Sequence, residues 1–293
     1  MTSTIAPGAQ LVPTSLGPVE VAVRGSADRQ VLLFPGGHCT AATPVGQDVY
    51  EELGYQVVTV SRPGYGATVV GDLAAAEFVP AVVEVAAVLG VARFSAVVGV
   101  SFGGLQALHT AATTDLAARL VLHSCAPSTR GFPDTRRERA MAPLVFHPRV
   151  QRATWAMTRA MVRRDRGLRL MMGQLSTLPA GEWFDDWSTE ERRQARETLL
   201  AMSSGRGFVR DLAQGRESGS AERERVQRAV AVPTLVTASR TDGGAPFGHA
   251  LDLEATITGS RLVETGAPSH FAWIGAPRRV LLESLADFLD AGA

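Results

Sequence analysis

Residues 94–104 read FSAVVGVSFGG and contain the most informative pattern in the chain. The run up to Val100 is almost wholly apolar, which is typical of a strand buried on both faces of a sheet. Ser101 follows among glycines, and the small residues of Leu105–Thr113 then predict a helix. The pattern G-x-S-x-G is common by chance, but its position between strand and helix is the context that it requires. We therefore expect Ser101 in a sharp, strained turn at the end of a buried strand.

Strand and helix patterns alternate through the first 126 residues. Short apolar runs bounded by Gly and Pro predict strands, and longer segments predict helices. The predicted strands are Gln10–Thr14, Val19–Arg24, Val31–Phe34, Gln56–Val60, Phe94–Val100 and Arg119–His123. The predicted helices are Val45–Leu53, Leu73–Leu89 and Leu105–Thr113. The first two strands predict a hairpin, and the others indicate a parallel sheet covered on both faces.

The strand pattern stops near Pro127 and resumes only after residue 230. The later predicted strands are Thr234–Ala238 and Arg261–Glu264, followed by a helix at Arg278–Leu289. Helical patterns dominate the interval, for example Arg149–Arg163 and Glu190–Met202. We expect an α/β protein with a mostly parallel, twisted sheet flanked by helices. Its body would comprise residues 1–126 and 231–293, and residues 127–230 would form an inserted helical cap.

The serine turn and the order of elements resemble the α/β-hydrolase superfamily, in the branch with a helical cap after the sixth strand. Members place an acid after the following strand and a histidine after the last strand. Here Asp242 follows the strand that ends at Ala238, and His270 follows the strand that ends at Glu264. The resemblance implies that Ser101 is the nucleophile, His270 the general base and Asp242 the acid that orients it.

Such a triad also needs hydrogen-bond donors for the oxyanion of its tetrahedral intermediate. The resemblance implies the backbone N–H groups of Phe102 and Gly37. Family members usually have histidine before the loop glycine, whereas this chain has Pro35, which leaves the support of that loop open. The segment SRPGYG at residues 61–66 also resembles the family's turn after the fourth strand, with Ser61 where an acidic residue is common.

The insertion is rich in Met and Trp, a composition that suits an adaptable apolar pocket roof as well as ordinary helix packing. For the pocket we expect Met172, Trp183 and Trp187 from the insertion, and His38 from the loop after Val31–Phe34. Residues 127–230 hold 20 Arg against 13 Asp and Glu, and the rest holds 9 against 16. This favours solvated helix faces that dock on the body; a face for an acidic carrier protein or an anionic substrate is the alternative.

Composition argues against several classes of protein. The 29 basic and 29 acidic side chains balance, so no net charge directs the chain to nucleic acid or an anionic membrane. Two cysteines are too few for a disulfide framework, which favours the cytoplasm. The first ten residues lack the features of a signal peptide, and the apolar stretch Phe78–Ala92 is too short to span a bilayer and is interrupted by Pro80, Glu84 and Gly90. No spacing indicates a metal site or a nucleotide cofactor.

The resemblance implies hydrolysis of a carboxylic ester or lactone of a moderately apolar small molecule, through an acyl-enzyme. A serine at position 101 argues against haloalkane dehalogenase or epoxide hydrolase chemistry, for which family members carry a carboxylate there. The fold hosts many reactions, so other functions remain open. They are a thioesterase or C–C bond hydrolase with the same triad, a cofactor-free lyase or perhydrolase, and a ligand-binding protein without activity.

Overall fold

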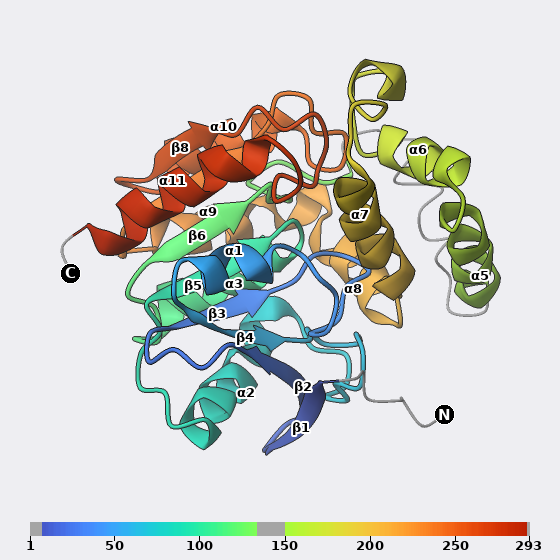
Figure 1. Cartoon of the computed structure of the whole chain (residues 1–293). Helices are drawn as coiled ribbons and strands as arrows, with labels where there is room; N and C mark the ends of the chain where they lie inside the picture. Colours follow the sequence, from blue (N-terminus) through green and yellow to red (C-terminus); the bar gives the residue numbers. More distant parts are fainter. Residues whose placement is uncertain (1–7, 134–149, 292–293) are drawn as a thin grey trace.

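The computed structural model describes residues 8–133 and 150–291, and its strands form one twisted sheet (Figure 1). Their order across the sheet is β1-β2-β4-β3-β5-β6-β7-β8. The strands are β1 (Ala9–Thr14), β2 (Gly17–Arg24), β3 (Gln30–Phe34), β4 (Gln56–Val60), β5 (Ala96–Val100), β6 (Leu120–His123), β7 (Thr234–Ala238) and β8 (Arg261–Glu264). β1 and β2 form the predicted hairpin, β2 pairs antiparallel with β4, and all other pairs are parallel. The predicted fold class is confirmed.

Helices cover both faces of the sheet. They are α1 (Gln47–Glu52), α2 (Ala75–Val88), α3 (Gly103–Thr113), α9 (Ser220–Arg228), α10 (Phe247–Thr256) and α11 (Pro277–Asp290). Side chains of β3 alternate between two cores because successive strand residues point to opposite faces. Leu32 and Phe34 pack with α2, α3, α9 and α10, whereas Val31 and Leu33 pack with α1 and α11. This two-sided burial explains why the parallel strands are apolar throughout.

The described part of the segment between β6 and β7 is mainly helical, as the sequence predicted, and its strands are absent apart from an isolated bridge between Ser176 and Asp242. Its helices before α9 are α5 (Gln151–Val162), α6 (Asp165–Gly173), η1 (Ala180–Glu182), α7 (Thr189–Ala201), α8 (Gly207–Gln214) and η2 (Glu217–Gly219). In Figure 1, α5, α6 and α7 stand beside the sheet. α9 packs instead on α3 and α10, and its Val226 joins the body core. The predicted cap, residues 127–230, therefore includes at its end a helix that packs with the body.

Several element bounds differ from the prediction, and local backbone geometry explains them. α1 begins at Gln47 because Gly46, with φ of 88°, precedes it in the left-handed region. α3 begins at Gly103, directly after the turn at Ser101. Helix α10 was not predicted, and Arg149, at the start of one predicted helix, lies outside the described residues.

None of the helices in the described ranges has the length and apolar character needed to cross a membrane.

Glycines allow α3 to lie directly against the strands. A Cβ on Gly99 would stand 2.5 Å from the Cα of Gly104, and one on Gly104 would stand 2.5 Å from the Sγ of Cys125. A Cβ on Gly103 would collide with the carbonyl oxygen of Phe34 in β3. A side chain at Gly99 or Gly103 would require backbone to move, and one at Gly104 would displace the side chain of Cys125. The turn that carries Ser101 is therefore held between two strands and a closely packed helix.

We expect Gly103→Ala to lower the free energy of unfolding by about 1–3 kcal/mol, because the added methyl group overpacks the junction with β3. Gly173→Ala is the matched control, since its Cβ would lie 3.5 Å from the nearest atom, the Cβ of Ala180. That change should leave stability unchanged or raise it by up to about 1 kcal/mol, through helix propensity. Urea unfolding followed by circular dichroism measures both; equal stabilities for the two variants would contradict the packing argument.

Candidate active site

The residues predicted to act in catalysis all follow parallel strands. Gly37 lies after β3, Ser101 after β5, Asp242 after β7 and His270 after β8. Parallel strands present their carboxyl ends at one edge of a sheet, which is where such folds bind ligands. The topology thus brings together residues that are far apart in the sequence.

Ser101 occupies a strained backbone conformation. Its φ is 53°, in the left-handed region that is uncommon for residues other than glycine. The turn is held by hydrogen bonds on both sides: the Ser101 N–H donates to the carbonyl of His123 at 2.9 Å, and its carbonyl accepts from the N–H of Gly104 at 3.0 Å. A Cβ on Gly36 would lie 3.0 Å from the Cβ of Ser101, so the loop after β3 closely borders this serine.

His270 is bound to the buried carboxylate of Asp242. The His270 Nδ1 lies 2.8 Å from Oδ2 and 2.9 Å from Oδ1 of Asp242. Oδ1 also accepts the N–H groups of Gly244 at 2.7 Å and Ala245 at 2.9 Å. A Cβ on Gly244 would stand 2.8 Å from the Cγ of His270, so a glycine is needed beside the ring. The carboxylate is therefore fixed by its own loop and orients the imidazole.

The charge of Asp242 also sets the protonation of His270. Burial alone lowers the pKa of the imidazole, because it penalises the charged form. The attraction of the Asp242 carboxylate and its hydrogen bond outweigh burial, so the pKa of His270 is raised above its ordinary value. The pair suits a general base that must accept a proton and hold it as a cation.

Ser101 and His270 line one cavity of about 450 Å³. Among the described residues, no Asp, Glu or Arg side chain lines it, and Ser101 Oγ makes no hydrogen bond to the His270 ring. The polar side chains in the lining are Ser101, His270, His38 and Gln174. Aromatic rings supply much of the rest, namely Phe102, Phe132, Trp155, Phe208, Phe271 and Trp273. The cavity is thus mainly apolar, with few polar side chains in its wall.

The loop predicted to hold an oxyanion is supported by Arg62. Gly37 and Phe102 both line the cavity, and a Cβ on Gly37 would lie 3.2 Å from the Phe102 ring. Arg62 donates from Nε to the carbonyl of Pro35 at 2.9 Å and from Nη2 to the carbonyl of Gly36 at 3.0 Å. A guanidinium therefore fixes this loop, in a chain that has proline where the family usually has histidine.

A carboxylate also accompanies Ser61, at the position where the family commonly has an acid. The Ser61 hydroxyl donates to Oε1 of the buried Glu20 at 2.7 Å and accepts the Ala41 N–H at 2.6 Å. The other oxygen of Glu20 accepts the N–H of Ala67 at 3.0 Å. Glu20 comes from β2, which pairs with β4. It therefore provides the carboxylate that is missing at residue 61.

Of the predicted pocket residues, only His38 lines the cavity. Its ring lies 3.8 Å from the Phe208 ring, and its Nδ1 lies 2.8 Å from the Ser204 hydroxyl. Burial, and then the charge of Arg62, lower the pKa of His38 to about 3, so the ring is neutral. Cys39 also lines the cavity, but burial raises the pKa of its thiol to about 12, which leaves it a poor nucleophile.

The prediction that Met172, Trp183 and Trp187 line the pocket was wrong. All three are buried in the core shared by the insertion and one face of the sheet. The two Trp rings pack on each other at 5.1 Å. The cavity instead receives Trp155 from α5 and Met171 from α6. Composition identified the right kind of residue but gave no information about which way each one faces.

The insertion is hydrogen-bonded to the loops that carry Asp242 and His270. The carbonyl of Leu175 accepts the N–H of Gly243 at 3.1 Å and the N–H of His270 at 2.9 Å. The N–H of Thr177 donates to the carbonyl of Thr241 at 2.9 Å. These backbone bonds join the segment after α6 to both loops.

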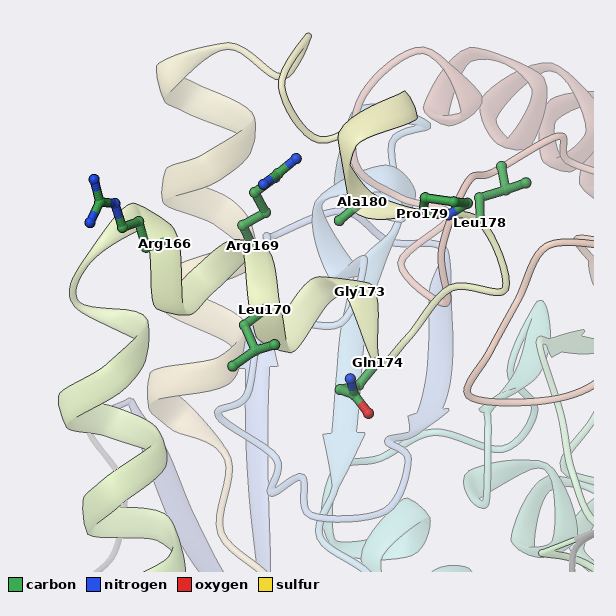
Figure 2. Close-up of a pocket in the computed structure, with 8 residues that line it drawn as sticks. All are labelled: Arg166, Arg169, Leu170, Gly173, Gln174, Leu178, Pro179 and Ala180. Atoms are coloured by element: carbon green, nitrogen blue, oxygen red, sulfur yellow. The ribbon is translucent and has the colours of Figure 1, made fainter.

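A second hollow, of about 370 Å³, lies between α6 and the turn that holds Ala180 (Figure 2). Neither Ser101, Asp242 nor His270 lines it. Its charged groups are Arg166, which points away from the other labelled side chains in Figure 2, and Arg169, which pairs with Asp185 at 3.1 Å. Without a nucleophile or base in its lining, this hollow is a weaker candidate for a reaction site.

The described residues also contain no group of three or more His, Cys, Asp or Glu placed to hold a metal ion. The first cavity, which Ser101 and His270 line, is therefore the stronger candidate for the reaction site.

Comparisons with known proteins agree with the fold. A hydrolase of Bacillus subtilis (strain 168) named uncharacterized hydrolase YcgS is 25% identical over 281 residues, which cover 94% of this chain and 96% of that protein. An alpha/beta hydrolase fold protein from Nakamurella multipartita superposes with a TM-score of 0.78 at 21% identity, covering 97% of this chain and all of that one. The enol-lactonase from Burkholderia xenovorans LB400 superposes with a TM-score of 0.69 at 18% identity, covering 96% and 99%.

The family assignment rests on the sequence itself. Residues 31–284 match the alpha/beta hydrolase family, and this range includes each strand end that borders the cavity. The chain therefore belongs to the alpha/beta hydrolase family and is an enzyme of the hydrolase type.

Proposed function

We propose that this protein hydrolyses a carboxylic ester or lactone of a moderately apolar small molecule by a serine mechanism. The observation that carries the proposal is the strained Ser101 in the same cavity as His270, whose Nδ1 is bound to the buried Asp242. A serine hydroxyl needs a neighbouring base to become a nucleophile, and that base needs a carboxylate to fix its tautomer. The enol-lactonase among the structural neighbours is consistent with ester chemistry but shows only the fold.

In the proposed reaction, His270 removes the proton of Ser101 as the hydroxyl oxygen attacks the carbonyl carbon. The resulting oxyanion accepts the N–H groups of Gly37 and Phe102, and His270 returns the proton to the departing alcohol. Water then repeats the sequence on the acyl-enzyme. Asp242 stays ionised throughout and stabilises the imidazolium.

The cavity wall supports an apolar, uncharged acyl group. Aromatic and aliphatic side chains dominate it, and no charged side chain of the described residues is present to pair with an ionic substrate. A volume of about 450 Å³ suits a small molecule. We further propose that the segment 127–230 selects the substrate, because α5, α6, α7 and α8 all contribute to this wall. A cytoplasmic location is proposed from the two buried free cysteines alone.

Ser101→Ala should abolish turnover of p-nitrophenyl esters and labelling by a fluorophosphonate, because the attacking oxygen is lost. The expected fall in kcat is on the order of 10⁶. The control is Ser95→Ala, just before β5 and at the opposite end of that strand, which should keep wild-type activity. A folded Ser101→Ala protein that retains more than a few per cent of wild-type turnover would contradict the nucleophile assignment.

The pH profile should report the ionisation of His270. Only neutral imidazole accepts the proton, so kcat/KM should fall as the pH drops through one pKa above the ordinary value of about 6.5. Asp242→Asn removes both causes that raise this pKa and leaves burial, which lowers it. The midpoint should therefore move to lower pH, and kcat should fall by about 10⁴.

The control for this profile is His38→Gln, since His38 already has a pKa of about 3 and does not titrate in this range. It should keep the wild-type midpoint. Rates measured between about pH 5 and 9 decide the matter. A flat profile, or an Asp242→Asn midpoint equal to that of the wild type, would exclude His270 as the base.

Acyl-chain preference should depend on Trp155. Each methylene buried against the cavity wall contributes about 0.8 kcal/mol, so kcat/KM should climb about fourfold per carbon until the cavity is full. Trp155→Ala enlarges the cavity and should move the optimum to longer chains. Trp183→Ala, a buried tryptophan outside the cavity, should leave the optimum in place.

A panel of p-nitrophenyl esters of increasing chain length measures this preference. Matched acyl thioesters in the same assay separate an esterase from a thioesterase. An optimum that moves with Trp183 and not with Trp155 would show that this cavity does not bind the acyl chain.

A further inference from the structure

We propose that Asp211, on helix α8, is a positioning residue for the oxyanion hole. It does not line the cavity; it acts through Arg62, whose guanidinium fixes the loop that precedes Gly37. The inference rests on the proposed serine mechanism, in which the Gly37 N–H binds the oxyanion. It assigns a catalytic consequence to an ion pair between the body and the insertion.

Arg62 and Asp211 form a two-point ion pair away from solvent. Nη1 lies 2.5 Å from Oδ1, and Nη2 lies 2.8 Å from Oδ2. Their side chains are only 6% and 4% exposed. The Tyr65 hydroxyl donates a further hydrogen bond to Oδ2 at 2.5 Å. The parallel arrangement fixes the plane of the guanidinium as well as its position.

The remaining N–H groups of Arg62 are directed at the loop after β3. Nε donates to the carbonyl of Pro35, and Nη2 donates to the carbonyl of Gly36 as well as to Asp211. The Gly36 carbonyl belongs to the same peptide group as the Gly37 N–H. Holding that carbonyl oxygen therefore fixes the direction in which the Gly37 N–H points, because the peptide group is planar.

Helix α8 contacts the same loop through a second residue. A Cβ on Gly37 would lie 3.2 Å from the ring of Phe208, and this ring packs on His38. Phe208 and Asp211 lie three residues apart on α8 and so occupy neighbouring positions on its surface. The helix thus holds the loop by apolar contact on one side and through Arg62 on the other.

The test compares Asp211→Asn with a double variant, Arg62→Met with Asp211→Leu. The first leaves a buried arginine without its counterion and can fail to fold. The second replaces both charges by apolar groups, a change that buried ion pairs often tolerate. The double variant removes the hydrogen bonds from Arg62 to the loop, and Asp211→Asn removes the charge that holds the Arg62 guanidinium in position. We expect kcat for p-nitrophenyl acetate to fall by about 10- to 100-fold, as for a displacement of about 1 Å at the reacting centre.

Binding of an alkyl trifluoromethyl ketone should weaken by a similar factor. Ser101 adds to this carbonyl, and the resulting oxyanion occupies the same hole. KM for the ester should change little, because ground-state binding uses the apolar wall. A role in stability alone would lower the melting temperature without weakening ketone binding to the folded protein.

Arg223→Gln is the matched control. Arg223 is also buried and anchors the end of α8 through the carbonyl of Gln214, but it does not contact the loop. It should lower the melting temperature and leave kcat and ketone affinity unchanged. Wild-type values in the folded double variant, or an equal loss of kcat and ketone affinity in Arg223→Gln, would overturn the proposal. If the wild type reacts with neither compound, the serine mechanism fails, and the inference fails with it.

Discussion

The site depends on how closely helix α3 approaches the sheet. Glycines at 99, 103 and 104 let the helix backbone touch β3, β5 and Cys125, where any side chain would collide. This contact forces the chain to reverse sharply at Ser101 and holds that residue in the left-handed region. The strain is balanced by the packing of two strands and a helix, so the hydroxyl is positioned by the core. The loops after β7 and β8 are then arranged around a serine whose position is already fixed.

Charged groups play a different part, because they fix the turns and loops that follow the strands. Glu20 ties β2 to the turn after β4, and Arg62 ties that turn to the loop after β3 and to helix α8. Asp242 ties the loop after β7 to the histidine after β8. The carboxylates of Glu20 and Asp242 are both buried, and each accepts more than one hydrogen bond. They give the loops around the cavity definite positions, where apolar packing alone would tolerate several.

Much of the body could be predicted from sequence because its signals are local. Apolar runs bounded by glycine and proline identified the strands. Resemblance to the family identified Asp242 and His270, which the structure brings into contact. The wall of the cavity could not be predicted in this way. Met171 and Met172 are neighbours, but they point about 100° apart on a helix. Which one faces the cavity depends on how α6 packs, and no local pattern encodes that. The pairing of Arg62 with Asp211, 149 residues later, likewise cannot be recognised from the sequence around either residue.

The backbone bonds of Leu175 and Thr177 restrict how far the segment after α6 can move relative to the loops of Asp242 and His270. Each bond contributes about 1 kcal/mol to stability, and together they join the insertion to the loops of both Asp242 and His270. An outward rigid-body movement of the insertion would break these bonds or displace the loops of Asp242 and His270, and it would also separate Arg62 from Asp211. A rigid opening movement of this segment is therefore coupled to the geometry of the site itself.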